Sequence, residues 1–182
     1  MAGFDWFWKA LGGKSGRNQK RSVAIVNQVE NHAAELDALD DVALAQRAKD
    51  LASGGRIDNH AEFLAILGVA SQRTLGLKPY PVQSQAVLRL IEGDVVHMAT
   101  GEGKTLVGAM AATGLGLMGK RVHSITVKDY LAVRDAEWMR PLVEFFGLSV
   151  ASISEKMDAG ERRQAHKAAI VSNPCFLSIF AA

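Results

Sequence analysis

Cysteine and proline are scarce in this 182-residue sequence, which has one cysteine, Cys175, and 4 prolines. A single cysteine excludes an intramolecular disulfide scaffold and indicates a reducing compartment. The 17 glycines follow no period, so a collagen-like chain is excluded as well. With 48% hydrophobic and 22% charged residues, the composition predicts a globular protein with one sizeable core rather than two full domains.

Long apolar runs are also missing. The uncharged stretch at residues 106–119 spans 14 residues, whereas crossing a bilayer takes about 20. The sequence therefore predicts no membrane span. The 5 histidines show no spacing typical of a metal site, and Cys175 has no cysteine partner.

Charge is unevenly distributed along the chain. Residues 1–21 hold five basic residues and one acid, so this arm carries +4, and because the whole chain carries +2, the remainder carries −2. An aromatic cluster that includes Trp6 and Trp8 precedes most of the basic residues, which is the reverse of a secretory signal. Rings followed by cations fit an anionic lipid surface, and a solvated terminus whose rings pack on the body is the alternative. The basic residues are Lys9, Lys14, Arg17, Lys20 and Arg21.

Apolar periodicity predicts helices in the first half of the chain. From Val23 to Leu51, apolar residues recur every three to five positions, with a break at residues 40–41. Further helices are predicted at residues 61–75 and 83–90. The predicted segments of this half are a basic aromatic arm at residues 1–22 and a mostly helical segment at residues 23–92.

Beyond Gly93, short buried strands alternate with helices. This alternation predicts an α/β fold with a parallel sheet of βαβ units and helices on both faces. Residues 93–169 are expected to form this part, followed by an uncharged tail at residues 170–182. The strands are predicted at residues 95–98, 122–127, 148–153 and 170–171, and the helices at residues 104–118, 131–146 and 159–168.

One segment carries recognisable chemistry. Residues 98–105 read M-A-T-G-E-G-K-T, directly after a predicted strand and before a long apolar helix. They match the phosphate-binding pattern G-x-x-x-x-G-K-[ST], with Met98 at the first glycine position. A glycine-rich turn that merely ends in Lys-Thr is the alternative, and the order of strand, loop and helix favours nucleotide binding. The predicted binding residues are Met98, Ala99, Thr100, Gly101, Glu102, Gly103, Lys104 and Thr105.

The key positions of the loop have expected roles. Gly101 and Gly103 let backbone amides converge on an anion, to which the following helix adds its free N–H groups. Lys104 is expected to reach the β and γ phosphates of ATP, and the Thr105 hydroxyl to complete the shell of a Mg²⁺ ion. Glu102 is expected to orient its neighbours rather than to touch the nucleotide. Lys104 and Thr105 are therefore the candidate catalytic residues.

A glutamine upstream is a candidate for reading the base. Gln83 lies 15 residues before Met98, in a stretch that contains Pro79 and Pro81. Its side-chain amide can bond an adenine edge through one donor and one acceptor. Taken alone, the same stretch is also typical of an ordinary helix start.

Two strings make a family resemblance specific. They are T-G-E-G-K-T-L at residues 100–106 and T-V-K-D-Y-L-A-V-R-D-A-E-W-M at residues 126–139. With them the sequence resembles SecA, the ATP-driven motor of bacterial protein export, from about Phe7 to Arg163, and it looks most like the accessory second paralogue. The resemblance implies a RecA-like P-loop NTPase fold, similar to helicase superfamily 2, with an incomplete sheet. It also implies that Gln83 reads adenine and that Asp129 and Arg134 belong to a coupling motif.

The same resemblance implies cofactors, partners and a location. The cofactors are ATP and Mg²⁺, and the activity is ATP-dependent transport of preproteins. The implied partners are preprotein substrates, a SecYEG-type membrane channel, an anionic lipid surface and a full-length SecA molecule, with no nucleic acid. The implied location is the cytoplasm and the cytoplasmic face of the cell membrane.

The sequence departs from the family pattern at several positions. Pro81 stands where the family usually has Asp, His97 where it has Glu, and Lys128 where it has Asn. His97 matters most chemically, because the charge of histidine changes near neutral pH. After Arg163 the family's N-E-x-x-F-D-like motif does not follow, and no Asp-Glu dipeptide occurs in the chain. The acidic pair that would hold Mg²⁺ and polarise water is missing, so hydrolysis by this chain alone is left open.

Two other functions compete with a translocase ATPase. A nucleic-acid helicase fragment would have a basic body and a P-T-R-E-L-like motif, whereas here the body carries −2 and the motif reads T-V-K-D-Y. A chain that binds nucleotide or lipid without turnover fits the missing acidic pair and stays open.

Overall fold

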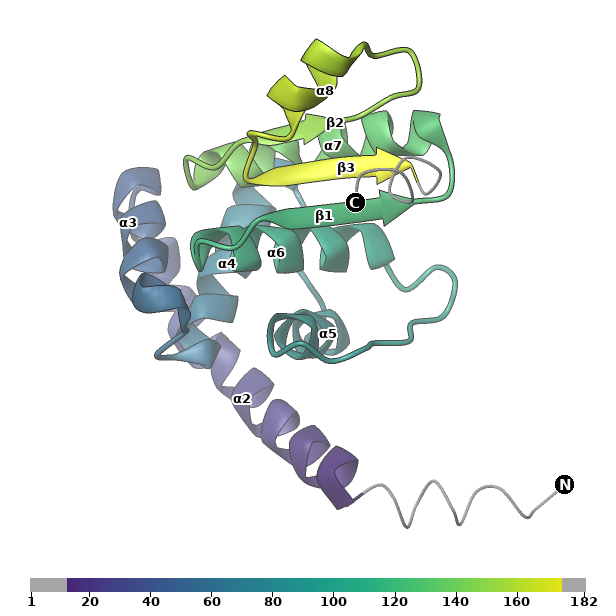
Figure 1. Ribbon diagram of the computed structural model, residues 1–182. Coiled ribbons are helices and arrows are strands. Elements are labelled where there is room, and N and C mark those ends of the chain that lie inside the picture. The colour runs from purple at the N-terminus through teal and green to yellow at the C-terminus, as the bar shows by residue number, and fades with distance from the viewer. Residues whose placement is uncertain (1–12, 175–182) are drawn as a thin grey trace, which may run out of the picture.

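The first half of the described chain is helical. The computed structural model describes residues 13–174, and the side chains from residue 20 onward. Its first helices, drawn in purple to teal in Figure 1, are α2 (Gly13–Asp37), α3 (Asp41–Leu51), the short 3-10 turn η1 (Ser53–Gly55), α4 (His60–Leu75) and α5 (Pro81–Ile91). The predicted helices of this half and the break at residues 40–41 are thereby confirmed.

Local capping residues fix the ends of these helices. Asp40 is the N-cap of α3, where its Oδ1 accepts a hydrogen bond from Ala43 N at 2.8 Å. At the start of α4, Asn59 Oδ1 accepts from Glu62 N at 3.3 Å. The same helix ends at Gly76, whose φ of +70° is the left-handed conformation that favours glycine. The two N-caps satisfy N–H groups that have no partner within their own helix.

The second half of the described chain forms a parallel sheet. The strand order is β1-β3-β2, and both outer strands run parallel to β3, with Val122 and Val150 each opposite Ile170. The predicted α/β fold with parallel βαβ units is therefore confirmed. The elements are α6 (Lys104–Leu117), β1 (Val122–Thr126), α7 (Asp129–Phe145), β2 (Val150–Ser152), α8 (Ala159–Ala165) and β3 (Ile170–Pro174).

The predicted strand at residues 95–98 is wrong. Val95 is 99% exposed, while Val96 and Met98 pack against the core, so the side chains alternate as they would in a strand. None of the three strands within residues 13–174 pairs with this segment, however. A short apolar run is typical of a buried strand, but a strand also needs a neighbour that satisfies its N–H and C=O groups. The phosphate loop therefore follows an unpaired segment.

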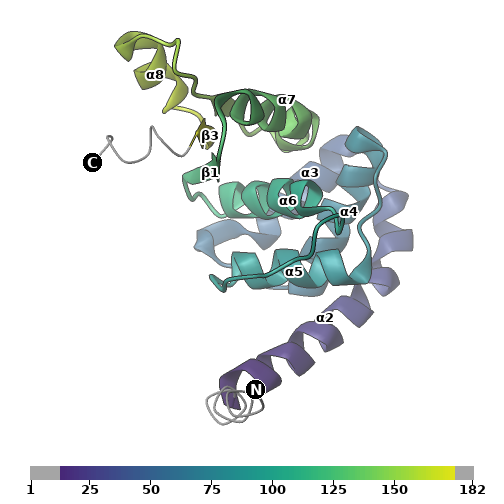
Figure 2. The same ribbon diagram turned by 90° about the vertical axis from the view of Figure 1, so that its right-hand side faces the viewer.

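Helices lie on both sides of the sheet in the described part of the chain. Figure 2 shows α6 and α7 on the same side of the strands, and both helices contact β1 and β3. His123 and Ile125 of β1 alternate with partly buried residues and are exposed, Ile125 to 57%. Helix α8 lies on the other side of the strands in Figure 2, where the ring centroids of His166, at the C-cap of α8, and His123 of β1 are 5.7 Å apart, so the prediction of helices on both faces is confirmed.

One hydrophobic core joins the helical half to the sheet. Helix α4 lies at its centre and contacts α2, α3, α5, α6 and α7. Its side chains Phe63, Ile66 and Leu67 are fully buried, and the same cluster includes Met110 of α6 and Ile170 of β3. The helix that begins at the phosphate loop is therefore held in place by the core.

The central position of α4 is tested by Phe63→Ala. We expect this change to lower the free energy of unfolding by about 3 to 5 kcal/mol, because it removes a fully buried ring and leaves a cavity. Val42→Ala on α3 is the control, since Val42 is 80% exposed, and we expect it to change stability by less than about 0.5 kcal/mol. Urea unfolding followed by circular dichroism measures both. A loss of unfolding free energy below about 1 kcal/mol for Phe63→Ala would contradict the position of α4 at the centre of the core.

Candidate nucleotide-binding site

The loop at residues 98–103 leads into α6 through two glycines. Gly101 has a φ of +88° and Gly103 a φ of +78°, values that other residues adopt only with strain. Gly103 is the N-cap of α6, and the first backbone bond of that helix joins Val107 N to Gly103 O at 3.2 Å. The N–H groups of the three residues before Val107 therefore have no acceptor within the helix and are available to an anion.

Lys104 folds back over this loop from the first turn of α6. Its Nζ donates a hydrogen bond to Ala99 O at 2.8 Å. Lys104, the adjacent Thr105 and the rest of residues 101–105 are exposed. An ammonium group, a hydroxyl group and unpaired backbone N–H groups thus meet at one helix end. This combination of donors suits phosphate groups.

The peptide groups of Ala99 connect the two sides of the loop. Ala99 N donates to Glu102 Oε2 at 2.6 Å, and Ala99 O accepts from Glu102 N at 3.4 Å in addition to its bond with Lys104. Glu102 therefore contacts the backbone of its own loop. The sequence predicts no role for Ala99 beyond its place in the motif. Its contacts involve backbone atoms, which every residue type has, so the residue type does not indicate them.

Gln83 links the start of α5 to the loop. Its Oε1 accepts from Tyr80 N at 2.9 Å, and its Nε2 donates to Glu102 O at 2.9 Å. The residue is only 7% exposed. A side-chain amide has two donors and an oxygen with two lone pairs, so each end of Gln83 keeps one further bond for a ligand. A Cβ added at Gly103 would overlap Gln83 Nε2, so a larger residue there would displace the end of the Gln83 side chain.

Tyr80 is a further residue at the site, and sequence reasoning missed it. It is the N-cap of α5 and is directly bonded to Gln83, yet its side chain is 70% exposed. An exposed ring beside an amide that faces the phosphate loop offers a flat surface to a planar base. The signal is present in the sequence as an aromatic residue between Pro79 and Pro81, in a stretch from which the sequence analysis predicts a role for Gln83 alone.

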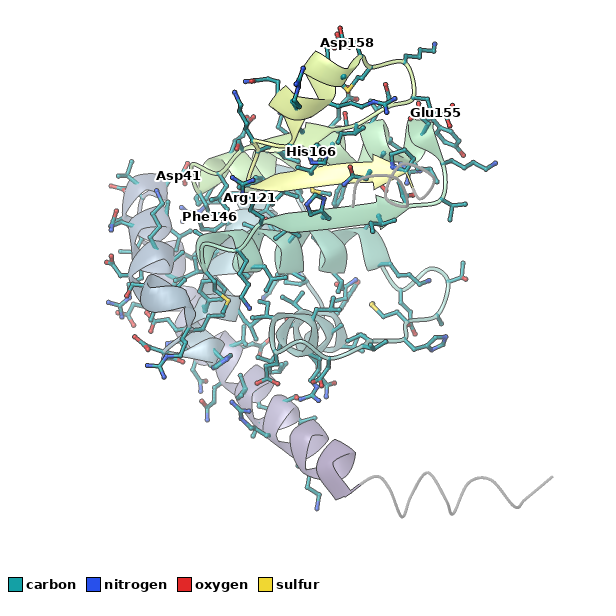
Figure 3. The ribbon with its side chains drawn as sticks, viewed as in Figure 1. Asp41, Arg121, Phe146, Glu155, Asp158 and His166 are labelled. Atoms are coloured by element: carbon teal, nitrogen blue, oxygen red, sulfur yellow. The ribbon has the colours of Figure 1, made fainter. Side chains whose placement is uncertain are left out.

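Asp129 and Arg134 lie on α7, away from the loop itself. Asp129 Oδ1 accepts from Glu155 N at 2.9 Å, and Arg134 Nη2 pairs with Asp135 Oδ1 at 2.7 Å. Within the described part of the chain, neither side chain bonds to residues 98–105. Figure 1 shows that the phosphate loop and the carboxyl ends of β1 and β3 lie on the same side of the molecule, and Figure 3 shows Glu155 near that end of the sheet.

The basic arm is only partly described. Lys9 lies outside the described residues, and Lys14 and Arg17 fall in α2 at positions whose side chains are not described. Lys20 is exposed, whereas Arg21 forms an ion pair with Glu92 at 3.1 Å. No helix in residues 13–174 is long and apolar enough to cross a membrane. In the same range, no group of three or more His, Cys, Asp or Glu residues could hold a metal ion.

Comparison with known proteins gives consistent matches. The family model for the SecA DEAD-like domain matches residues 7–174. The chain is 98% identical over 174 residues to protein translocase subunit SecA 2 of Corynebacterium glutamicum strain ATCC 13032, which covers 96% of this chain and 23% of that protein. It is 72% identical over 171 residues to SecA 2 of Corynebacterium efficiens, covering 94% and 22%. It is 49% identical over 166 residues to SecA 2 of Mycolicibacterium smegmatis, covering 88% and 21%. The chain thus spans less than a quarter of the length of these relatives.

The contact between Gly103 and Gln83 is tested by Gly103→Ala. We expect a larger loss of stability than for Gly119→Ala, because both glycines have a similar positive φ, +78° and +75°, but only the Cβ at 103 meets Gln83. Strain costs about 1 kcal/mol in each variant, and displacement of the Gln83–Glu102 bond adds about 1 kcal/mol. Urea unfolding of both variants measures the difference, which should vanish when Gln83→Ala is also present. Equal losses in the two single variants would contradict the contact.

Proposed function

Because the chain belongs to the SecA DEAD-like domain family, we propose that its loop at residues 98–105 binds the phosphates of ATP as part of a SecA-type protein translocase. The family has a RecA-like fold, in keeping with the parallel sheet. The observation that carries the proposal is the position of Lys104, whose ammonium group lies over the start of an exposed loop at the N-terminus of α6.

The loop fits a phosphate chain in shape as well as in charge. Gly101 and Gly103 hold the backbone in the left-handed conformation, which a larger residue would adopt only with strain. Backbone amides in turns of this kind can converge on an anion. To bind phosphate, Lys104 would exchange its bond with Ala99 O for bonds to the β and γ oxygens. The exchange replaces a neutral acceptor with a charged one, which strengthens the bond.

Mg²⁺ would accompany the nucleotide and be held through Thr105. Mg²⁺ usually keeps several waters and takes one or two protein oxygens together with phosphate oxygens. The exposed Thr105 hydroxyl in the first turn of α6 is such a ligand. Because no cluster of acids in residues 13–174 holds a metal by itself, metal binding here would depend on the phosphates.

The base would lie against Gln83 and Tyr80. Gln83 keeps one donor and one lone pair beyond its bonds to Glu102 and Tyr80, which is the number needed to pair with an adenine edge. The exposed Tyr80 ring adds a surface for stacking. Both residues are adjacent to the loop, so residues at the starts of α5 and α6 would bind the base and the phosphates together.

Transport belongs to the longer protein of which this family's domain is a part. We propose that ATP binding here serves the export of preproteins through a SecYEG-type channel, by a protein that works in the cytoplasm and at the cytoplasmic face of the membrane. Asp129 supports a coupling role, because its bond to Glu155 N ties the start of α7 to the segment after β2. A full-length SecA molecule is the further partner proposed.

A chain that binds nucleotide without turnover is the second candidate. It is favoured by one observation, the absence of an Asp-Glu dipeptide from all 182 residues. Phosphoryl transfer to water relies on positioned metal, water and opposing cations, and the loop supplies only part of that set.

Nucleotide binding is tested by Lys104→Ala, with Lys120→Ala as the matched control at the other end of α6. We expect Lys104→Ala to weaken binding of a fluorescent ATP analogue by at least about tenfold, because a charge-assisted bond to phosphate is lost. Lys120→Ala should leave the Kd unchanged. Equal binding by wild type and Lys104→Ala would contradict the proposal.

Hydrolysis by the same proteins separates the two candidates. Release of phosphate that depends on Lys104 would support an ATPase and remove the non-catalytic alternative. Binding of the ATP analogue without release of phosphate from ATP would support the chain that binds nucleotide without turnover.

Lipid contact is tested by replacing four basic residues of the arm with Gln. We expect vesicles rich in phosphatidylglycerol to lose at least about tenfold in affinity, since each cation near an anionic surface adds about 1 kcal/mol. Vesicle flotation measures the bound fraction. The control removes the same charge from exposed positions on the body, and similar losses for both variants would contradict a specific role of the arm. The arm residues are Lys9, Lys14, Arg17 and Lys20, and the control residues are Lys49, Lys120, Lys156 and Lys167.

A further inference from the structure

Glu102 is an acid in the middle of a loop that is proposed to bind an anion. A carboxylate close to phosphate raises the free energy of the complex by repulsion, so its presence needs a compensating role. The structure shows one contact for its side chain: Oε2 accepts from Ala99 N at 2.6 Å. This distance is that of a short hydrogen bond to a charged acceptor, the stronger class of hydrogen bond.

The bond closes a turn that the backbone alone closes weakly. Residues 99–102 form a turn with the positive-φ Gly101 at its third position, and the backbone bond from Glu102 N to Ala99 O is long, at 3.4 Å. The side chain of Glu102 closes the same four residues a second time with a shorter bond. Glu102 is also held through its own carbonyl by Gln83 Nε2. The side-chain carboxylate and the backbone carbonyl of Glu102 therefore both fix the shape of the loop.

On this side of the loop the side chains of Val96 and Met98 pack against the core, but the backbone shares no ladder with a strand of the described chain. The preceding residues 95–98 pair with no strand, so the sheet does not hold the loop start. Lys104 bonds to Ala99 O, but it must leave that oxygen when phosphate binds. The Glu102–Ala99 bond can persist in both states, because Ala99 N lies at the start of the loop and not among the amides at the N-terminus of α6.

We propose that Glu102 is a positioning residue, whose carboxylate holds Ala99 N and thereby keeps the phosphate loop in its binding shape before the nucleotide arrives. This inference rests on the proposed nucleotide binding and deepens it. Glu102 touches no phosphate. It reduces the conformational freedom that the loop would otherwise lose on binding, and so strengthens affinity through preorganisation.

Two substitutions separate this role from an effect of charge. Glu102→Ala removes the acceptor, and we expect the Kd for a fluorescent ATP analogue to rise about tenfold. Glu102→Gln removes the charge but keeps an oxygen that accepts from Ala99 N, so its Kd should stay within about threefold of wild type. Glu137→Ala, which removes an exposed acid on α7, is the control and should have no effect.

Other patterns would overturn the inference. Tighter binding by both Glu102 variants would mean that the carboxylate acts on the nucleotide by repulsion. Equal weakening of both would mean that the charge itself is needed, and no change in either would mean that the bond to Ala99 has no role.

A measurement without nucleotide keeps the inference separate from the proposed function. Amide hydrogen exchange of Ala99 should be protected in the wild-type chain and in Glu102→Gln, and about tenfold faster in Glu102→Ala. If the amide exchanges at the same rate in all three proteins, the positioning role is wrong even where ATP binds. If the protection pattern is as expected and wild type binds no nucleotide, the proposed function fails instead.

Discussion

The side-chain amide of Gln83 is the contact on which the geometry of the candidate site depends. It joins Tyr80 N, at the start of α5, to Glu102 O, in the phosphate loop, across 19 positions of the sequence. The segment before the loop has no strand partner in the described residues, so the sheet does not set the position of the loop start. The helical half contributes instead, through the buried Gln83 and through the core against which Val96 and Met98 pack. The groups proposed to bind the base and the phosphates are thereby connected to each other.

The other end of the loop is fixed by the core through α6. Two glycines let this helix approach its neighbours closely: a Cβ at Gly114 would lie 2.7 Å from Ile91 Cδ1, and one at Gly116 would lie 2.9 Å from Leu148 Cδ1. The fully buried Met110 adds contacts of its own. Since the N-terminus of α6 is the proposed anion site, close packing along the helix keeps that terminus in place. Stability and ligand geometry therefore depend on the same helix.

The sequence predicts the parts of this structure that are encoded locally. The break predicted at residues 40–41 is where Asp40 caps the start of α3, and the predicted alternation of strands and helices corresponds to the parallel sheet. The strand at residues 95–98 could not be judged in this way, because the short apolar run that begins with Val95 and Val96 is a local signal, whereas strand pairing depends on distant residues. The motif likewise located Lys104 and Gly103. It could not show that Ala99 connects both sides of the loop or that Gln83 bonds to Glu102, since these contacts depend on the packing of α5 against α6.

The most direct test of the account is an NMR titration of the isotope-labelled chain with ADP and Mg²⁺. The account predicts that the largest amide shifts fall on residues 100–106 and on the side-chain amide of Gln83, because these groups would face the phosphates and the base. Amides of β2 and α8 should change little. The absence of shifts at saturating nucleotide, or shifts centred outside the loop and the start of α5, would contradict the assignment of this site.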